Sequence, residues 1–165
     1  MLPKLSAENG REFTCFPTAI LVLVVNDEDE VLLFSKKKSE WVVIAGGVED
    51  DETILEAALR ELREEAGTNV KVLPIGVSHA HTFHYDDSTR NMISIYYVFR
   101  YRGGEVVPGD DMSGAKYEWK SMQDLSESEL LIPAGQKWIL ERSVSFASTF
   151  EAQKADLEYI TSRGA

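Results

Sequence analysis

Residues 46–67 read GGVEDDETILEAALRELREEAG, and no other stretch of the chain is as informative. Apolar residues recur at three- and four-residue intervals from Thr53 to Ala66, a spacing that predicts an amphipathic helix. Thr53 or Asp51 can cap the start of this helix, and Gly67 stands where a left-handed residue commonly ends one. The apolar face, which we expect to pack on a sheet, consists of Leu55, Ala58, Leu59, Leu62 and Ala66.

Three carboxylates of this helix lie close together. With about 100° between successive residues, Glu61, Glu64 and Glu65 fall within about 100° of one another, at the edge of the apolar face. Like charges at this spacing disfavour a helix by roughly a few tenths of a kcal/mol per pair, and a bound cation reverses that effect. Clustered carboxylates are hard oxygen ligands, which suit Mg²⁺, or alternatively Mn²⁺, better than a zinc-type site. The simpler interpretation, a solvated acidic face, describes Glu56 and Arg63, which point away from both faces.

The segment Gly46–Thr68 resembles the Nudix box, G-x5-E-x7-R-E-U-x-E-E-x-G-U, in which U is a bulky aliphatic residue. Eight of the nine fixed positions agree, and Thr68 stands where the last aliphatic residue is expected. Asp51 replaces a glycine common before the first glutamate, and Ile44 replaces a common proline; both differences concern loop geometry. The matching residues are Gly46, Glu52, Arg60, Glu61, Leu62, Glu64, Glu65 and Gly67.

The resemblance implies an α+β fold, an α/β/α sandwich with a mixed β-sheet. Residues 1–165 would form a single Nudix domain, with a core of about 13–145 and a C-terminal helical extension over 146–165. Outside the box, the sequence pattern predicts six strands: Thr18–Val25, Val31–Ser35, Trp41–Ile44, Val70–His79, Met92–Arg102 and Lys116–Ser121. It predicts three further helices: Leu125–Leu131, Ala134–Ser143, interrupted from the first by Pro133, and Phe150–Ser162.

The resemblance also assigns roles within the box. The implied metal ligands are three carboxylates and one backbone carbonyl, those of Glu61, Glu64, Glu65 and Gly46. The guanidinium group of Arg60 would bind carboxylates in a bidentate manner and hold their orientation, which the single amine of Lys would do poorly. Glu52 would brace the loop by pairing with Arg60. The implied catalytic residues are Glu52, Arg60, Glu61 and Glu64.

The general base is not fixed by the box. Glu64 is one candidate, and Glu118, just before Trp119, is another. A third source is the loop Gly103–Gly114, with four glycines, one proline and three acids, a composition suited to a mobile lid over the substrate. Its acids are Glu105, Asp110 and Asp111.

Weaker signals concern the substrate. Tyr85 follows the box at a distance at which tyrosines in related enzymes stack on a base, and His81 could contact a base or phosphate. His79, His81 and His84 lie within six residues, but no cysteine lies nearby to complete a zinc site. The run Lys36–Lys38 either meets an anionic leaving group or forms a solvated loop.

Taken together, these features predict a Mg²⁺-dependent pyrophosphohydrolase. Its substrate would be a nucleoside diphosphate linked to another moiety: a nucleotide sugar, an ADP-ribose-like compound or a dinucleoside polyphosphate. The alternatives are a pyrophosphatase that removes damaged nucleoside triphosphates and a catalytically silent binding module with a Nudix fold. Which substrate is used is not set by the box, because base and sugar contacts come from loops outside it.

The composition excludes several other classes of protein. The 28 acidic residues against 17 basic ones give a net charge of −11, which argues against binding to nucleic acid polymers. Cys15 is the single cysteine, so an intrachain disulfide is impossible. The longest apolar run, Ala19–Val25, is far shorter than the roughly 20 residues of a membrane span, and the first residues do not resemble a signal peptide. We therefore expect a cytoplasmic protein with no membrane partner; a homodimer is one of the oligomeric states left open.

Overall fold

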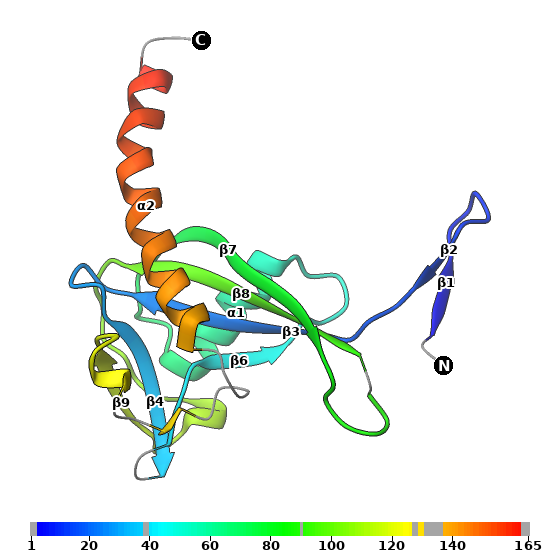
Figure 1. Cartoon of the computed structure of the whole chain (residues 1–165), viewed down its shortest axis with the longest axis horizontal. Helices are drawn as coiled ribbons and strands as arrows, with labels where there is room; N and C mark the ends of the chain where they lie inside the picture. The colour runs from blue at the N-terminus through cyan, green and yellow to red at the C-terminus, as the bar shows by residue number, and fades with distance from the viewer. Residues whose placement is uncertain (1–2, 38–39, 90, 127–128, 131–136, 163–165) are drawn as a thin grey trace.

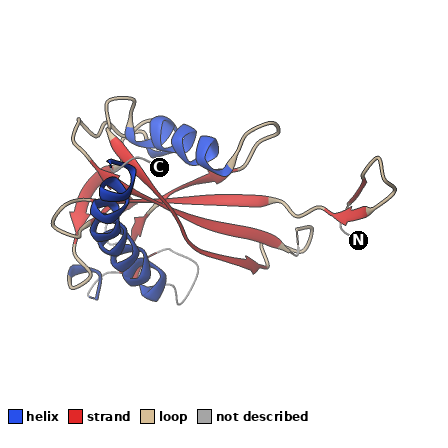
Figure 2. Cartoon of the chain, turned by 90° about the horizontal axis from the view of Figure 1, so that it is seen from above, coloured by secondary structure: helices blue, strands red, loops and turns tan. Residues whose placement is uncertain are grey.

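The computed structural model describes residues 3–37, 40–89, 91–126, 129–130 and 137–162. In this part of the chain, one mixed sheet lies between two α-helices, α1 (Ile54–Ala66) and α2 (Lys137–Ser162), as Figures 1 and 2 show. This is the predicted α+β fold with helices on both faces of a sheet. No helix of the described residues is long and apolar enough to cross a membrane.

The large sheet is built around two long parallel neighbours. Strands β3 and β8 pair over eight residues, from Thr18 opposite Ile93 to Val25 opposite Arg100. The order along the sheet is β10-β5-β4-β3-β8-β7, with β6 added to β3 and β9 added to β4. The strands are β3 (Thr18–Val25), β4 (Val31–Lys37), β5 (Glu40–Val42), β6 (Ile44–Gly47), β7 (Val72–Phe83), β8 (Met92–Tyr101), β9 (Lys116–Lys120) and β10 (Glu129–Leu130).

The sheet opens between β3 and β4. The two strands pair where Val25 faces Val31, next to the turn that joins them. Farther along, β6 takes the edge of β3, with Ala19 opposite Gly47, while β5 and β9 pair with β4.

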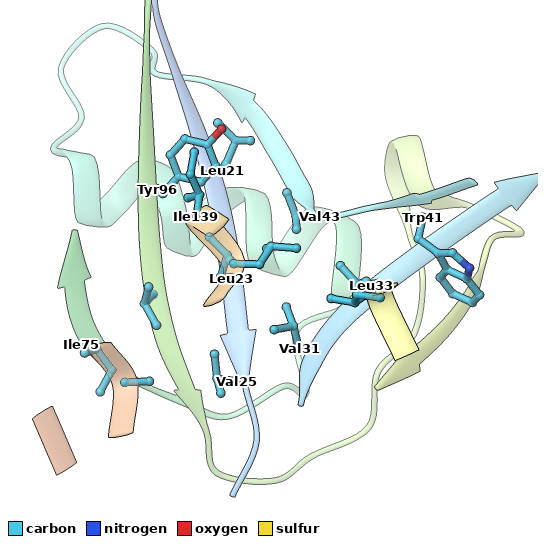
Figure 3. Packing of buried hydrophobic residues seen from close by; sticks show 14 residues of the cluster. Leu21, Leu23, Val25, Val31, Leu33, Trp41, Val43, Ile75, Tyr96 and Ile139 are labelled. Carbon is cyan, nitrogen blue, oxygen red and sulfur yellow. The ribbon is translucent and has the colours of Figure 1, made fainter. Parts of the chain in front are cut away.

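Alternate residues of β3 enter two separate cores. Leu21, Leu23 and Val25 belong to the cluster under α2, which includes Ile139 and is drawn in Figure 3. Ile20, Val22 and Val24 face α1. Because β3 is buried on both faces from Ile20 onward, its sequence from Ala19 to Val25 is apolar and does not alternate.

Five of the six predicted strands agree with the structure to within a few residues. The sixth, Trp41–Ile44, is divided between β5 and β6, which pair with β4 and β3, respectively.

The predicted C-terminal helices also differ from the structure. Of the predicted helix Leu125–Leu131, residues 127, 128 and 131 lie outside the described residues. The described part forms the 3-10 turn η2 (Asp124–Ser126) and β10, which pairs in parallel with β5. The other two predicted helices are one helix, since α2 runs through residues 144–149 without a break. Pro133 and residues 134–136 lie outside the described residues.

The N-terminus forms a hairpin that the sequence did not predict. β1 (Lys4–Ser6) and β2 (Glu12–Thr14) pair antiparallel, with Leu5 opposite Phe13. Figures 1 and 2 both show this hairpin standing away from the rest of the molecule, joined to β3 by an extended segment. Cys15 is half-buried in that segment.

Candidate active site

Helix α1 begins at a complete capping box. The Thr53 hydroxyl accepts a hydrogen bond from the backbone N–H of Glu56 at 3.3 Å, and the Glu56 carboxylate accepts one from the Thr53 N–H at 2.7 Å. Thr53, not Asp51, is therefore the cap. Asp51 has a φ of 66°, a left-handed conformation that favours glycine, the residue that the resemblance implies at this position.

The three predicted carboxylates differ in burial. Glu65 is 3% exposed and Glu61 is 7% exposed, whereas the side chain of Glu64 is 43% exposed. The prediction that all three lie at the edge of the buried face is thus wrong for Glu61 and Glu65. The buried face is wider than expected on the carboxylate side, where Ala57 is fully buried.

Glu61 packs directly against the backbone of Gly46 in β6. A β-carbon placed on Gly46 would lie 1.8 Å from Oε1 of Glu61 and 2.4 Å from Oε2. Glu65, one turn later in the helix, contacts the same strand: its Oε2 accepts a hydrogen bond from the Ala45 N–H at 3.3 Å. The end of β6 and two buried carboxylates therefore meet at one point.

Arg60 holds the exposed side of this cluster. Its Nε and Nη2 atoms donate to the two oxygens of Glu52 at 3.1 and 2.8 Å, and Nη2 also donates to the Gly47 carbonyl at 2.8 Å. Nη1 donates to Glu61 at 2.7 Å and to Glu64 at 3.2 Å. The predicted pairing of Glu52 with Arg60 is present, and it ties the loop before α1 to the carboxylate cluster.

Burial makes the charged forms of the inner carboxylates costly. Burial raises the pKa of Glu65 to about 7, the charges of Glu61 and Asp111 add to this, and the Ala45 N–H and the Lys36 charge oppose it. Burial also raises the pKa of Glu61, although Arg60 opposes it. In contrast, Arg60 holds the pKa of Glu52 below its usual range.

These residues fit a hard divalent cation. The carboxylates of Glu61 and Glu65 lie beside the end of β6, so the donor set is oxygen, and a cation would offset the cost of their burial. Within the described ranges, no three His, Cys, Asp or Glu side chains already converge on one point that could hold a metal ion. Arg60 bridges Glu61 and Glu64 instead, so gathering these ligands requires the Arg60 Nη1 contacts to change.

The loop Gly103–Gly114 is packed on α1, which differs from the mobile lid that its composition predicts. The N–H of Val107 donates to the Ala66 carbonyl at 2.9 Å, and the N–H of Gly109 donates to the Glu65 carbonyl at 3.1 Å. Val106 and Met112 are buried in the core beneath α1. Here glycine permits close approach: a β-carbon on Gly109 would lie 2.6 Å from the Glu64 carbonyl oxygen. The loop ends in the 3-10 turn η1 (Asp110–Met112).

Two cavities flank the carboxylate cluster. The first, of about 540 Å³, is lined by Pro17, Ala19, Ala45, Gly46, Gly47, Tyr85, Thr89 and Met92. The second, of about 380 Å³, is lined by Ala19, Leu21, Lys36, Val42, Val43, Ala45, Glu65, Phe83, Tyr85, Ser94, Asp111 and Met112. The two share Ala19, Ala45 and Tyr85, so they adjoin where β3 meets β6. The second lies where β3 and β4 diverge.

The structure brings some predicted residues to this cleft and leaves others elsewhere. Tyr85 lines both cavities, and Lys36 and Asp111 line the second. Lys37 pairs with Glu40 at 3.7 Å, and Lys38 lies outside the described residues. Glu118 pairs with Lys120 at 2.8 Å on β9.

His81 lines neither of the two cavities. It stacks on Tyr96 with ring centroids 5.7 Å apart, and His79 packs edge-on against Trp138 at 4.9 Å. The two histidines thus belong to an aromatic row along β7. The same row includes Phe83, which lines the second cavity and which the sequence analysis missed, although it alternates with His81 along the strand.

The comparisons with known proteins point to one family. The model of the NUDIX domain matches residues 16–141. No curated protein sequence matches the chain. Among solved structures, a NUDIX-family hydrolase from Clostridium perfringens is 24% identical, with a TM-score of 0.59, covering 80% of this chain and 96% of its own.

Two further structures share the fold at lower identity. A MutT protein from Methanosarcina mazei Go1 is 21% identical, with a TM-score of 0.60, covering 84% of this chain and 95% of its own. An ADP-ribose pyrophosphatase from Streptococcus suis is 18% identical, with a TM-score of 0.59, covering 81% of this chain and 92% of its own.

Proposed function

Since this chain belongs to the Nudix hydrolase family, we propose that it hydrolyses the diphosphate bond of a nucleoside diphosphate linked to another moiety, with Mg²⁺ as its cofactor. The observation that carries the proposal is that two buried carboxylates contact the backbone of β6, Glu61 at Gly46 and Glu65 at Ala45. Two buried carboxylates beside a cleft serve no evident packing purpose, and they supply oxygen ligands for a divalent cation. Mn²⁺ has the same ligand preference and is the natural substitute.

We assign the binding of the cation to Glu61, Glu65 and the Gly46 carbonyl, joined by Glu64 at the exposed edge. When bound, such a cation neutralises a diphosphate and lowers the pKa of an attacking water. The chain's own contribution is orientation. Arg60 helps to fix the carboxylates because its Nε and Nη2 atoms both contact Glu52. This pairing attaches the loop before α1 to the helix.

The remaining residues of the cleft place the substrate. Lys36 contributes a positive charge at the wall that also contains Glu65, where a phosphate chain would lie. Asp111 faces the same cavity and can accept a proton from the attacking water. The products are two phosphorylated fragments. No nucleic acid polymer or membrane is needed, and we expect the reaction to take place in the cytoplasm.

A metal-supplemented substrate screen tests the proposal. Nucleotide sugars, ADP-ribose, dinucleoside polyphosphates and nucleoside triphosphates would be incubated with Mg²⁺ and scored by phosphate release after phosphatase treatment. Glu65→Gln and Glu64→Gln should lower turnover of the best substrate by orders of magnitude. Glu56→Gln is the matched control on the same helix, because glutamine preserves the capping box.

The same screen separates the alternatives. If nucleoside triphosphates alone are cleaved, the enzyme is the triphosphate pyrophosphatase considered above. If nucleotides bind without turnover at any Mg²⁺ concentration, the chain is a silent binding module. Near-wild-type rates in both Glu64→Gln and Glu65→Gln would show that the carboxylate cluster is not the catalytic site.

A further inference from the structure

We propose that the N-terminal hairpin, which comprises β1, β2 and their connecting turn, docks on the outer strand β7 of a second copy of this chain, and that two copies exchange their hairpins. In the single chain, all residues of β1 and β2 are exposed. Figure 1 shows the hairpin away from both helices and from the large sheet. An isolated two-stranded hairpin is marginally stable at best in water, so we expect it to need a surface on which to pack.

One face of the hairpin is apolar. Leu5 and Phe13 are direct partners in the pairing of β1 with β2, so their side chains project from the same face. Leu5 is 66% exposed and Phe13 is 47% exposed, and the Arg11 guanidinium lies 4.9 Å from the centroid of the Phe13 ring. The next pair, Ser6 and Glu12, projects from the other face. The hairpin thus presents an apolar face to solvent in the single chain.

The connection to β3 directs the hairpin away from its own sheet. Residues 15–17 join β2 to β3, and the carbonyl of Pro17 accepts a hydrogen bond from the Ile93 N–H at 2.9 Å. This bond continues the pairing of β3 with β8 and fixes the direction in which the segment leaves the sheet. Phe16 precedes a proline, which favours an extended backbone and disfavours the reversal needed to fold back. The hairpin is therefore placed to reach another molecule.

A matching apolar surface lies along β7, which is the last strand of the large sheet in the described part of the chain. Val77 is opposite Tyr97 of β8, and Tyr97 packs against the core beneath α1, so Val77 belongs to the α1 face of the sheet. Val77 is 45% exposed. We call the exposed side chains of this strand on that face the β7 margin; they are Val77, Ala80 and Thr82.

The β7 margin suits side-chain packing better than the addition of a strand. The pairing of β7 with β8 shifts register between Pro74 and Gly76 and again between Val77 and His79. Such irregularities twist an edge strand and hinder pairing with a further strand. The apolar side chains of the margin, and not its backbone groups, therefore form the surface that receives the hairpin.

The size of the two surfaces favours an exchange between identical copies. A stable interface buries roughly 800 Å² and about 20–30 residues on each side. The hairpin closes with a hydrogen bond from the Cys15 N–H to the Pro3 carbonyl at 2.8 Å, so it spans residues 3–15. One hairpin on one margin falls short of that size, whereas a reciprocal exchange gives each copy a hairpin and a receiving margin. Twofold symmetry produces this arrangement.

Charge also favours contact through the hairpins. The charged side chains of residues 3–15 cancel, because they are Lys4, Arg11, Glu8 and Glu12, and the net charge of −11 belongs to the rest of the chain. Two copies therefore repel each other over most of their surface. A neutral hairpin with an apolar face can approach the sheet of a second copy without this repulsion.

The oligomeric state of the full-length chain provides the first test. Light scattering after gel filtration should give twice the 18.5 kDa mass of one chain for the wild type. The double variant Leu5→Ser/Phe13→Ser should be monomeric, and so should Val77→Glu, with circular dichroism to show that each variant is folded. Tyr117→Ser, which changes a comparably exposed aromatic residue on β9, is the matched control and should remain a dimer.

Two results of this test would overturn the exchange. A wild type that is monomeric at all concentrations would show that the hairpin does not bind a second copy. A dimer that survives the hairpin variant would show that the copies meet elsewhere. Neither result bears on the proposed catalytic function, which the carboxylate variants test separately.

Disulfide cross-linking identifies the receiving surface while leaving both surfaces largely intact. In a Cys15→Ser background, copies with Leu5→Cys or Phe13→Cys are mixed with copies with Val77→Cys and oxidised. A disulfide needs β-carbons within about 4.5 Å of each other, so linked pairs of the two kinds of copy should form only if the hairpin lies on the β7 margin. Tyr117→Cys replaces Val77→Cys in the control and should give no such pairs. Links between hairpins alone would overturn the role of β7.

Discussion

Glu61 lies so close to Gly46 that a β-carbon on the glycine would stand 1.8 Å from its Oε1 atom. The φ of Gly46 is not left-handed, so alanine is sterically permitted in the backbone there. The clash falls on the end of a flexible side chain, which can move away. The glycine is therefore required for the placement of a carboxylate and not for the path of the strand.

Gly46→Ala should consequently lower kcat by at least about tenfold while changing the free energy of unfolding by less than about 1 kcal/mol. Gly47→Ala is the neighbouring comparison, because its added methyl group meets no atom within 4 Å. It should cost far less activity than Gly46→Ala. Steady-state kinetics and urea unfolding measure the two effects, and equal activity losses in the two variants would contradict the role given to Gly46.

Stability without metal should depend on pH through Glu65. Its pKa is raised to about 7 in the folded protein from 4.5, so the folded state binds this proton more tightly than the unfolded state. The contribution to stability is complete below about pH 4.5 and is lost as the pH rises through about 7. In EDTA, the melting temperature of the wild type should fall across this range relative to that of Glu65→Gln.

Millimolar Mg²⁺ should reverse this loss, since a ligand that binds the folded state alone raises its stability. The gain should be largest above about pH 7, where the Glu65 carboxylate is charged, and small in Glu65→Gln. Thermal melts in EDTA and in Mg²⁺ at several pH values provide the measurement. Identical curves in EDTA and in Mg²⁺ would count against a metal site.

Arg60→Lys should impair catalysis although the charge is kept. A lysine has one nitrogen, so it cannot reproduce the contacts of Nε and Nη2 with Glu52 together with those of Nη1. We expect kcat to fall about tenfold or more. Arg63→Lys, which changes an exposed arginine on the same helix, should be close to wild type. A double-mutant cycle with Glu52→Gln should show coupling between residues 52 and 60, and independent effects would contradict the bracing role.

We propose Asp111 as the general base. It lines the second cavity together with Glu65, whereas Glu64 accepts a hydrogen bond from Arg60 and Glu118 pairs with Lys120. Asp111→Asn should lower kcat about 10²–10⁴-fold with little change in KM. Asp110→Asn and Glu105→Gln, which change exposed residues, should stay active. If Asp111→Asn keeps its rate while Glu64→Gln or Glu118→Gln is inactive, the base belongs to another element.

The helix α1 could be predicted from sequence because its signals are local. The capping residue, the apolar spacing and the terminal glycine all lie within one segment, and the structure places α1 at Ile54–Ala66. The burial of Glu61 and Glu65 could not be predicted in the same way. It depends on how β6 folds back onto α1 and on the loop before β9, which reaches the helix from some forty residues later in the chain.

The C-terminal errors have similar causes. Glu129 and Leu130 form β10 because they pair in parallel with β5. The local sequence contains no signal for that pairing. In α2, serine, threonine and valine near residue 145 suggest a break between helices. The hydroxyls of Ser143, Ser148 and Thr149 instead donate to carbonyls four residues earlier, so these polar side chains find hydrogen-bond partners inside the continuous helix.

The two ends of α1 are completed by different means, and this has a consequence for folding. The first turn is closed by Thr53 and Glu56, which are neighbours in sequence. The last turn depends on amides of Val107 and Gly109, which lie roughly forty residues later in the chain. We therefore expect the end that carries Glu64 and Glu65 to become fully ordered once the loop after β8 has docked. An isolated peptide of residues 53–67 should fray at its carboxyl end, and the metal-binding geometry should arise late, at the closing step of assembly.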